Sequence, residues 1–526
     1  MLRSTLILIF LVYGISATAQ LITSALNPEQ TNLLQAYEAR SEHLKPTGYA
    51  PYLISTVKQD SIFDANTRNW ERKNYSNWIL RKLKNEHLFE VDKQDFHLEG
   101  DAAFNLETGD YVDAIGRRAY TNTRGYSLKG TVGKRIFFQT TFFETQSIFT
   151  NYMDSVVSTK GDFNETGGNL YNDRGAVPGY GRWKPFTRYK SSYDYDYTLA
   201  TGSFGVAINE NSFVQFGHDK QFVGYGYRSH LLSDASSPYP FLRAQISFWE
   251  GRVTYNSTWA VLQSLDPIVD VSYGNKEVMN RRLGARFNYL SVQPAPWFSF
   301  GLFDGTTWTW RRNSSPGSIE YYSPHGFLYT GNGIRNHIVG FNGQATLFKM
   351  VRTYGQFALN TKGRGMAAQA GVKVFGPVDN MVLQLEYNKV GQNYYYYAQG
   401  ANGTVLIDEP IQTGTQAIDY YQNNDMVLGH PMGVALDEIL IKGSYRLRDF
   451  FGNGSLNIVN QNSVSNPKDI LFLMVEGGYV VNPKSNAQIA AGILYRDEKS
   501  LNNSGMKTVY PFIAIRTNLF NRYQDF

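Results

Sequence analysis

The last strand-like run of the chain reads TVYPFIAIRTNLF, from Thr508 to Phe520, and the tail after it ends on the aromatic Phe526. A lipid bilayer admits only α-helices and closed β-barrels, because every backbone polar group inside it must be hydrogen-bonded. Beyond its first residues the chain has no apolar run of the roughly 20 residues that a spanning helix needs. The sequence therefore predicts an all-β fold, a transmembrane antiparallel outer-membrane β-barrel.

The first residues carry the pattern of a secretion signal. Arg3 precedes a short apolar run from Leu6 to Tyr13, and Ala17-Thr18-Ala19 before Gln20 fits the small-residue rule for cleavage. We expect residues 1–19 to be a signal peptide. The chain has no cysteine, which excludes a lipid-modified cysteine, a disulfide and a thiolate metal site.

The composition fits a barrel but does not demand one. Among 526 residues there are 37 tyrosines and 33 phenylalanines, which suits the aromatic girdles of a membrane barrel. The hydrophobic fraction of 42% resembles that of a soluble protein, yet only alternate barrel residues face lipid. A net charge of +5 is too balanced to indicate a nucleic-acid partner.

The region 20–92 differs from the rest of the chain. Apolar residues recur at helical spacing within Pro28–Leu44 and Tyr75–Phe89, and prolines lie between these segments. The sequence predicts a small N-terminal helical periplasmic region here, with a loosely ordered linker as the alternative. The barrel itself is expected over 93–526.

From Phe96 onward, apolar and polar residues alternate, which predicts strands with one face toward lipid and one toward a wet lumen. His97 and Glu99 are examples expected to face the lumen. A second alternating run places Tyr195 and its neighbouring tyrosines on one face, and Asp194 and Asp196 on the other. These two carboxylates are expected to line the lumen.

Strand-like runs begin near 95, 125, 136, 192, 212, 241, 252, 283, 297, 336, 352, 365, 381, 434, 455, 470, 486 and 507. This gives about 18 strands, an even number typical of porin-sized barrels. Every second connection is a short turn, at 134–135, 209–211, 250–251, 293–296, 349–350, 376–380, 452–454 and 482–485.

Short turns that alternate with long connections are typical of outer-membrane barrels, which have tight periplasmic turns and long external loops. The stretches near 150–190, 306–335 and 390–433 are therefore expected outside the cell. By the same count, the last strand runs down and leaves Phe526 in the periplasm.

No catalytic motif emerges. None of the eight histidines has a partner at the i, i+4 spacing of a helical zinc site, and no P-loop or G-x-S-x-G elbow is present. Asp194 and Asp196 could form an acid and base pair, but solvated pore lining is the simpler interpretation. The sequence predicts no enzyme, no cofactor and no metal.

One charged segment stands out between two predicted strands: FGHDKQFVGYGYRSHLLSD, from Phe216 to Asp234. It gathers His, Asp, Lys and Arg around several glycines and returns through a proline-containing stretch. We interpret it as an ordered segment folded at or into the barrel mouth. A structural plug or interior ion-pair network, and contact with a ligand, remain equal alternatives.

The run FGHDKQFVGYGYRSHLLSDASSPYP resembles a segment of Wzi-type capsule-assembly proteins, and the ending IRTNLFNRYQDF is similar to gliding-motility members of the RemB type. The resemblance covers about 180–245 and the C-terminus. It implies an outer-membrane barrel with a small periplasmic helical element, a lectin-like and non-enzymatic role in holding capsular or secreted polysaccharide, and a contribution to gliding. The residues that carry it are His218, Asp219, Lys220, Gly224, Tyr225, Gly226 and Arg228.

The predicted external loops hold residues suited to sugars, because flat rings stack on sugar faces and arginines pair with carboxylates. The candidate glycan-binding residues are Trp183, Lys184, Trp308, Trp310, Arg311, Arg312, Tyr321 and Tyr322. For Tyr394 to Tyr397, which form a third aromatic group, we favour a place in the upper aromatic girdle.

Two other functions remain open. A diffusive porin would keep its lumen clear, and an outer-membrane phospholipase would need a Ser and His pair, for which Asn336-His337 is the nearest fragment. The expected partners are surface polysaccharide, outer-membrane lipid, the barrel assembly machinery acting on the C-terminal strand, and motility or secretion machinery.

Overall fold

The computed structural model describes residues 21–24, 26–40, 47–55, 73–113, 116–158, 175–189, 192–209, 211–270, 277–309, 334–399, 405–406, 417–462, 467–500, 505–518 and 521–526. The predicted signal peptide, 1–19, lies outside the described residues. Among the residues described, no helix combines the length and the apolar character needed to cross a bilayer.

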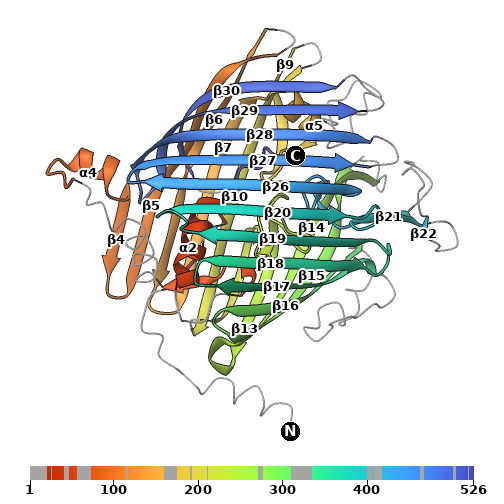
Figure 1. Ribbon diagram of the computed structural model, residues 1–526, viewed down its shortest axis with the longest axis horizontal. Helices are drawn as coiled ribbons and strands as arrows, with labels where there is room; N and C mark the ends of the chain where they lie inside the picture. Colours follow the sequence, from red (N-terminus) through yellow and green to blue (C-terminus); the bar gives the residue numbers. More distant parts are fainter. Residues whose placement is uncertain are drawn as a thin grey trace.

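Eighteen antiparallel strands close into a barrel, as the sequence predicts (Figure 1). The strands are β5 (Phe96–Val112), β6 (Arg118–Val132), β7 (Ile136–Ile148), β10 (Ser192–Asn209), β11 (Ser212–Asp219), β13 (Tyr239–Phe248), β14 (Val253–Asp270), β15 (Glu277–Ala295), β16 (Phe298–Thr309), β17 (Ile334–Leu347), β18 (Val351–Asn360), β19 (Met366–Phe375), β20 (Met381–Val390), β26 (Leu436–Leu447), β27 (Phe450–Gln461), β28 (Lys468–Asn482), β29 (Ala487–Ser500) and β30 (Met506–Thr517).

The last strand closes the barrel against the first. β30 pairs with β29 on one side and with β5 on the other, from Phe512↔Gly109 to Arg516↔Asn105. The last strand of the barrel therefore pairs with the first, as closure requires. Closure removes both sheet edges, which would otherwise present unpaired backbone groups to lipid.

Short connections gather at one end of the barrel, here called the short-turn end, and the other end is called the long-loop end. One predicted turn is wrong: Gly452 and Gly454 lie inside β27, paired with β26, and the connection is Arg448-Asp449. Arg448 takes the positive φ of 57° that this two-residue turn requires, so the nearby glycines misled the assignment.

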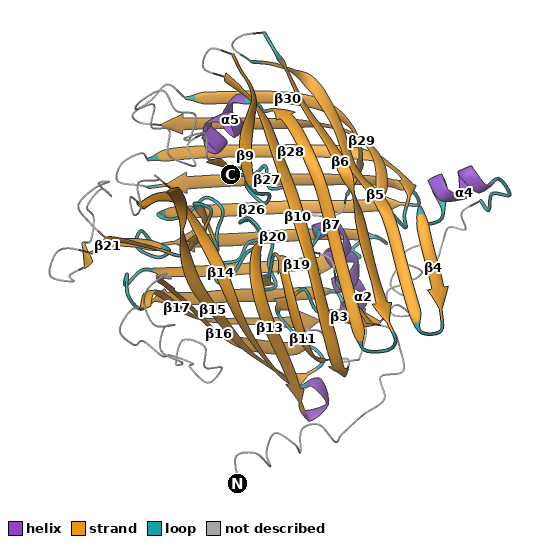
Figure 2. Ribbon diagram, turned by 180° about the vertical axis from the view of Figure 1, so that it is seen from behind, coloured by secondary structure: helices purple, strands orange, loops and turns teal. Residues whose placement is uncertain are grey.

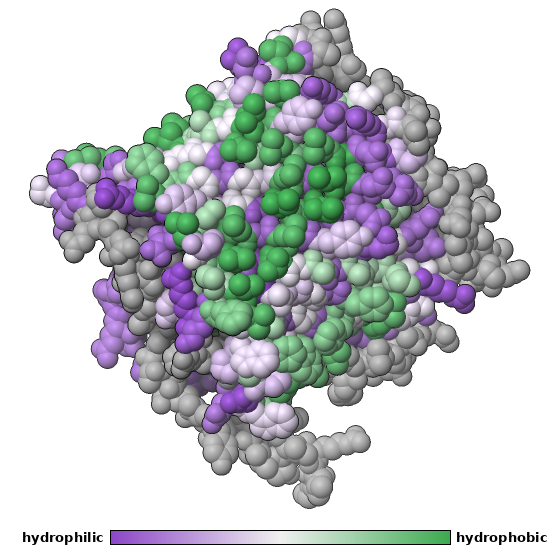
Figure 3. Space-filling view, in the orientation of Figure 1, coloured by the Kyte–Doolittle hydropathy of each residue, from purple (hydrophilic) through white to green (hydrophobic). Residues whose placement is uncertain are grey.

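The outer face of the strands carries an apolar belt. On β10, Phe204, Val206 and Ile208 are all exposed, while the intervening positions face inward. Figure 3 shows a hydrophobic band that crosses the strands between more polar ends. The predicted alternation is confirmed on β5, where His97 and Glu99 are buried on the lumen side. The belt is the surface that a bilayer would cover.

The predicted faces are reversed in the upper part of β10. Tyr195 and Tyr197 are buried inside, whereas Asp194 and Asp196 lie half-exposed on the other face, where Asp194 pairs with Arg117. A strand needs only about 9–11 residues to cross a bilayer, and β10 has 18. Its upper part extends beyond the belt, so its outer face is polar there and its inner face packs aromatic rings.

Smaller elements complete the fold. They are β1 (Leu21–Thr23), α2 (Pro28–Arg40), β2 (Tyr49–Ala50), β3 (Leu53–Ser55), α4 (Trp78–Lys84), β4 (Phe89–Lys93), α5 (Asn151–Ser158), β8 (Gly175–Ala176), β9 (Arg182–Tyr189), β12 (Phe222–Val223), η1 (Trp249–Gly251), β21 (Tyr396–Gln399), β22 (Val405–Leu406), β23 (Ala417–Tyr420), β24 (Gln422–Asn423) and β25 (Met426–Val427). α4 projects from the barrel at the end opposite β21 (Figure 1).

The N-terminal region holds the two predicted helices, but it is not wholly separate from the barrel. α2 lies within the barrel outline in both ribbon views (Figures 1 and 2). Its Ala36 and Ala39 pack against Phe375 of β19 and Val382 of β20, and Gln35 accepts a hydrogen bond from Lys373 (2.9 Å). Of the two helices, only α4 lies outside the barrel, as expected of a separate helical region. The other helix, α2, fills the short-turn end of the lumen.

Closure of the barrel can be tested at Gly109. A Cβ atom on Gly109 would lie 2.2 Å from the carbonyl oxygen of Pro511, so Gly109→Ala must push β5 away from β30. We expect a destabilisation of about 1–3 kcal/mol, typical of overpacking, and a smaller heat-modifiable fraction on unheated gels. Gly452→Ala is the matched control, because a Cβ there meets nothing within 4 Å. Equal folding of the two variants would contradict the assigned seam.

Candidate functional site

The segment between β11 and β13, residues 220–238, leaves the barrel wall and runs through the lumen. We call it the luminal segment. It departs where β11 ends at Asp219 and rejoins the wall at Tyr239. Ser229, His230, Leu231 and Leu232 in it have no exposed surface. The predicted charged segment is thus folded into the barrel.

Local hydrogen bonds shape the luminal segment into a tight turn. The Val223 backbone N–H donates to the Leu232 carbonyl (2.8 Å), and the Ser229 hydroxyl accepts from the N–H groups of Leu231 and Leu232. Gly224 has a φ of 153°, and a Cβ there would lie 2.3 Å from Gln356 Nε2. Glycine is therefore required where the segment touches the wall.

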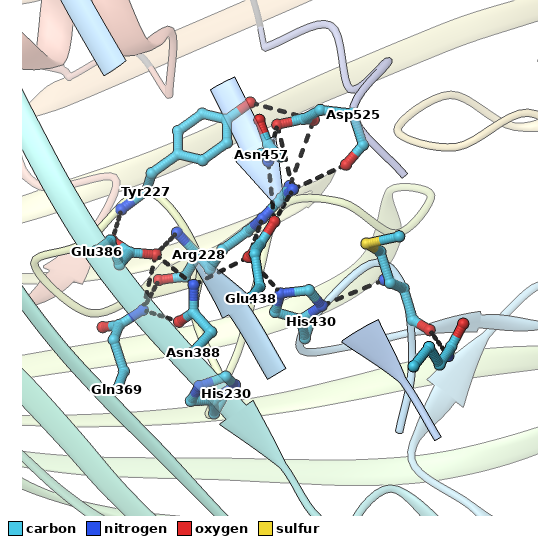
Figure 4. A network of polar contacts seen from close by, with 12 residues as sticks. Tyr227, Arg228, His230, Gln369, Glu386, Asn388, His430, Glu438, Asn457 and Asp525 are labelled. Carbon is cyan, nitrogen blue, oxygen red and sulfur yellow. Dashed lines mark hydrogen bonds and ion pairs between the residues drawn. The ribbon is translucent and has the colours of Figure 1, made fainter. Parts of the chain in front are cut away.

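Arg228 is the centre of a buried polar network (Figure 4). Its guanidinium reaches Glu438 of β26 (Nη2 to Oε1, 2.9 Å) and Asp525 near the chain end (Nη2 to Oδ2, 3.1 Å). The backbone N–H groups of Tyr227 and Arg228 donate to the two carboxylate oxygens of Glu386 on β20, at 2.8 and 3.0 Å. One residue thus joins the luminal segment, two wall strands and the C-terminal tail.

Two histidines extend this network. His430 contacts Glu438 (Nε2 to Oε2, 2.8 Å), and its ring stacks on that of His230 with centroids 5.9 Å apart. Burial lowers the pKa of His230 to about 3, and repulsion from the nearby His430 adds to this effect. The His230 ring is therefore neutral at ordinary pH. Both histidines are packed structural groups in contact with their neighbours.

The C-terminal tail, residues 521–526, also enters the lumen, which corrects the expectation that Phe526 lies in the periplasm. Tyr523 donates to Asp234 (2.5 Å), and Tyr152 of α5 donates to the Gln524 carbonyl (2.9 Å). Phe526 is buried, and its carbonyl oxygen accepts from Arg496 Nε (3.0 Å). The tail therefore runs back from the end of β30 toward the long-loop end.

A third segment, residues 47–55, fills the lumen from the N-terminal side. β2 pairs with β12 of the luminal segment. Tyr49 has no exposed surface, its hydroxyl lies 2.8 Å from Thr258 Oγ1, and its ring lies under the guanidinium of Arg243, at 4.2 Å. Cavities of about 180, 100 and 60 Å³ lie among these segments and the wall.

The seven residues that carry the resemblance to Wzi-type proteins do not lie together at one site. His218 is exposed on the outer face, with Nδ1 2.8 Å from the Ala200 carbonyl oxygen. Asp219 accepts from Gln139, Lys220 donates to the Gly179 carbonyl, and Tyr225 contacts Ser299. The close fit of Gly226 against Glu386 places the backbone beside that carboxylate. Arg228 carries the ion pairs.

The structure corrects three of the aromatic assignments. Trp308 lies in β16 and not in a loop, and its ring is buried against Gly284. Trp183 of β9 is buried in a T-shaped contact with Tyr195, with centroids 4.8 Å apart. Tyr394 and Tyr395 are buried in the luminal core, which excludes them from the outer girdle.

For Trp308 and Trp183 the reason is that they lie in paired strands where the sequence pattern indicated loops, so their rings point inward. Tyr394 and Tyr395 lie in the connection between β20 and β21, which packs them into the luminal core. Lys184, next to Trp183 on β9, is exposed. The other predicted glycan contacts, Trp310, Arg311, Arg312, Tyr321 and Tyr322, lie outside the described residues.

The sequence interpretation missed Glu386, Glu438 and Asp525. Glu386 occupies an inward position between the outward residues Leu385 and Tyr387, and Glu438 occupies one between Asp437 and the outward residue Ile439. That alternation was a usable signal for a charged lumen. The pairing of these acids with Arg228 could not be predicted from the sequence, because it joins residues as many as 297 positions apart. The described residues contain no group of three or more metal-ligating side chains.

Comparison with solved structures identifies similar barrels. Wzi of Escherichia coli, an outer membrane protein involved in group 1 capsule assembly and a carbohydrate binding β-barrel, matches with a TM-score of 0.54 and 12% identity, over 95% of this chain and 100% of that one. OccAB2 of Acinetobacter baumannii has a TM-score of 0.43 (11% identity; 81% and 97% covered), and OpdO of Pseudomonas aeruginosa has 0.42 (11%; 80% and 96%). No family model and no curated protein matches the sequence. The likeness to Wzi shows the fold, that of outer-membrane β-barrels.

The Arg228 network can be tested by removing its charge. Arg228→Met leaves Glu438 and Asp525 buried without their cation, which we expect to destabilise the barrel by about 3–5 kcal/mol. The measurement is the urea concentration at which heat-modifiability is lost. Lys389→Met is the matched control, because it removes the cation of an exposed pair with Asp437 (2.8 Å), for which about 0–1 kcal/mol is expected. Equal midpoints for the two variants would rule out a central role for Arg228.

Proposed function

We propose that the protein resides in the outer membrane, with its long-loop end outside, and binds or organises capsular or secreted polysaccharide at the cell surface. The observation that carries this proposal is the filled lumen: residues 47–55, the luminal segment and the C-terminal tail occupy it, and buried polar contacts hold them to the wall. A diffusive porin needs a continuous water path. Segments anchored by buried ion pairs favour a binding surface instead.

The resemblance of the charged segment and of the chain ending to Wzi-type and RemB-type proteins supports the same proposal, as does the carbohydrate binding named for the structural neighbour Wzi. The role in gliding remains a prediction that rests on the chain ending alone. The assembly machinery is expected to act on β30, because this strand closes the barrel.

We infer a binding role without catalysis. In the described part of the lumen, Glu438 is engaged by both Arg228 and His430. Asn336-His337, the nearest fragment of a phospholipase site, is buried inside the barrel, where the Asn336 amide donates to the Tyr395 carbonyl. A lipid-facing hydrolase would need its nucleophile at the outer boundary.

The direct experiment combines two measurements on the purified full-length protein. It should retain labelled capsular polysaccharide from the producing cells, and it should give no steady current in planar bilayers. Steady ohmic conduction without any glycan binding would establish the porin alternative and end this proposal.

The predicted external loop can be tested within the same assay. Replacing Trp310, Arg311 and Arg312 together by Ala should weaken polysaccharide retention by about ten-fold or more, because ring stacking and guanidinium pairing each contribute on the order of 1 kcal/mol. Trp249→Ala is the matched control, since this exposed ring lies at the short-turn end. Equal retention by both folded variants would remove this loop from the glycan site.

A further inference from the structure

The helix α4, which projects beyond the barrel at the short-turn end, buries none of its own side chains (Figure 1). Its seven residues are too few for a helix that is stable alone, and two asparagines hold it in shape. The Asn77 side chain caps it by accepting from two backbone N–H groups of the first turn. Asn482, at the end of β28, donates to the carbonyls of Lys82 and Glu86, at 3.0 and 2.8 Å. Polar contacts therefore fix the helix to the barrel.

Four of the seven α4 side chains are large, apolar and exposed. Trp78, Ile79 and Leu83 have 63, 56 and 57% of their surface exposed. Ile79 and Leu83 are four positions apart and lie on one face of the helix, with Leu80 beside them, whereas Arg81 lies on the opposite face. A group of exposed apolar side chains on an ordered element marks a contact surface.

The exposed apolar surface continues from α4 toward the barrel wall. Leu88 and Phe89, which follow the helix, are both more than half exposed. Phe89 pairs with Gly100 of β5, and the neighbouring Glu99 is buried on the lumen side, so Phe89 and Gly100 face outward. We call this apolar group the α4 patch, and its members are Trp78, Ile79, Leu80, Leu83, Leu88 and Phe89.

The wall beside α4 belongs to the lipid-facing side of the barrel. Lys84 Nζ lies 5.5 Å from the ring centroid of Tyr479, and this ring makes a T-shaped contact with Phe450 at 5.3 Å. Both rings line an apolar groove of about 790 Å³ on the outer wall, together with the exposed Ile489 and Ile513. Aromatic rings at the rim of the apolar belt are typical of the boundary between lipid and water. The α4 patch therefore adjoins the surface that lipid covers.

The charge around the patch is positive. Residues 73–89 carry one carboxylate, Glu86, against four side-chain cations, which are Lys73, Arg81, Lys82 and Lys84. Glu86 is already shared by Arg81 and Lys82, at 2.8 and 3.2 Å. An apolar face bordered by lysines and arginines is the pattern of helices that lie in the headgroup region of a bilayer. Their long side chains keep apolar stems near the acyl chains and place the charges at the headgroups.

We propose that the α4 patch lies in the headgroup region of the leaflet at the short-turn end and binds anionic phospholipid. Its apolar side chains pack among the ends of the acyl chains nearest the headgroups, and its cations contact the phosphates. Lipid is favoured over a soluble partner because the patch is continuous with the lipid-covered wall at Tyr479. The inference rests on the outer-membrane location proposed above and is independent of polysaccharide binding.

The test uses the full-length barrel, which has no cysteine of its own, in vesicles of phosphatidylcholine and phosphatidylglycerol in equal parts. Ile79→Cys carries a fluorescent dye, and the vesicles contain a lipid with a nitroxide quencher just below its headgroup. The dye should be quenched about three-fold more than the same dye on Asp379→Cys, an exposed residue of a short turn at the same end. Both positions are exposed, so folding should be retained, and heat-modifiability checks it.

The preference for anionic lipid is tested in the same labelled protein. Replacing Arg81, Lys82 and Lys84 together by Gln should lower the quenching at position 79 and remove its dependence on phosphatidylglycerol, because these cations attract anionic headgroups. Added salt should weaken the quenching before this replacement but not after it. The matched control removes three exposed cations of other short turns, which are Lys134, Arg135 and Lys349, and should leave the quenching at position 79 unchanged.

Quenching at position 79 that is no stronger than at position 379 overturns the proposal. If the dye is then shielded from aqueous iodide only when the vesicles hold the barrel at high density, the patch contacts a second copy of the chain. Strong quenching that the triple Gln replacement leaves unchanged overturns the preference for anionic lipid. A barrel that does not float with the vesicles ends the proposed membrane location, and this inference with it, whereas loss of polysaccharide binding alone leaves the inference standing.

Discussion

A closed barrel of this size encloses more space than its inward side chains fill, and barrels of 16–18 strands otherwise hold a water-filled channel. The structure depends on how that space is occupied. Three segments enter it, from the N-terminal region, from the connection between β11 and β13, and from the C-terminus. Arg228 links two of them to the wall through Glu438, Asp525 and the backbone contacts to Glu386. Burying the Arg228 guanidinium would be strongly unfavourable without these carboxylate partners.

The barrel itself could be predicted because its signals are local. Apolar and polar residues alternate along each strand, and short connections alternate with long ones; both patterns are visible in a few residues at a time. From them the number of strands, the closure of the barrel and the two faces of β5 could be predicted. The errors have physical causes. The upper part of β10 extends beyond the apolar belt, so Tyr195 faces inward, and Gly452 resembled a turn although it sits in β27.

The candidate site was predictable only in part. The luminal segment attracted attention because it concentrates charge and glycine, and its place inside the barrel agrees with one of the two interpretations weighed. Its partners were not foreseeable, because Arg228 and Asp525 are 297 positions apart in the sequence. The burial of Trp308 could not be predicted either, because it depends on how far β15 and β16 remain paired. Their pairing reaches Trp308 and places its ring in a strand and not in a loop.

The filled lumen is the central claim, and thiol labelling tests it most directly because the chain contains no cysteine of its own. Ser236 lies in the luminal segment with no exposed surface, and Ser236→Cys is a nearly isosteric change. In the native barrel, this thiol should resist a water-soluble maleimide and react only after heating, whereas Asn211→Cys in an exposed short turn should react at once. Rapid labelling of Ser236→Cys in the folded barrel would contradict the account.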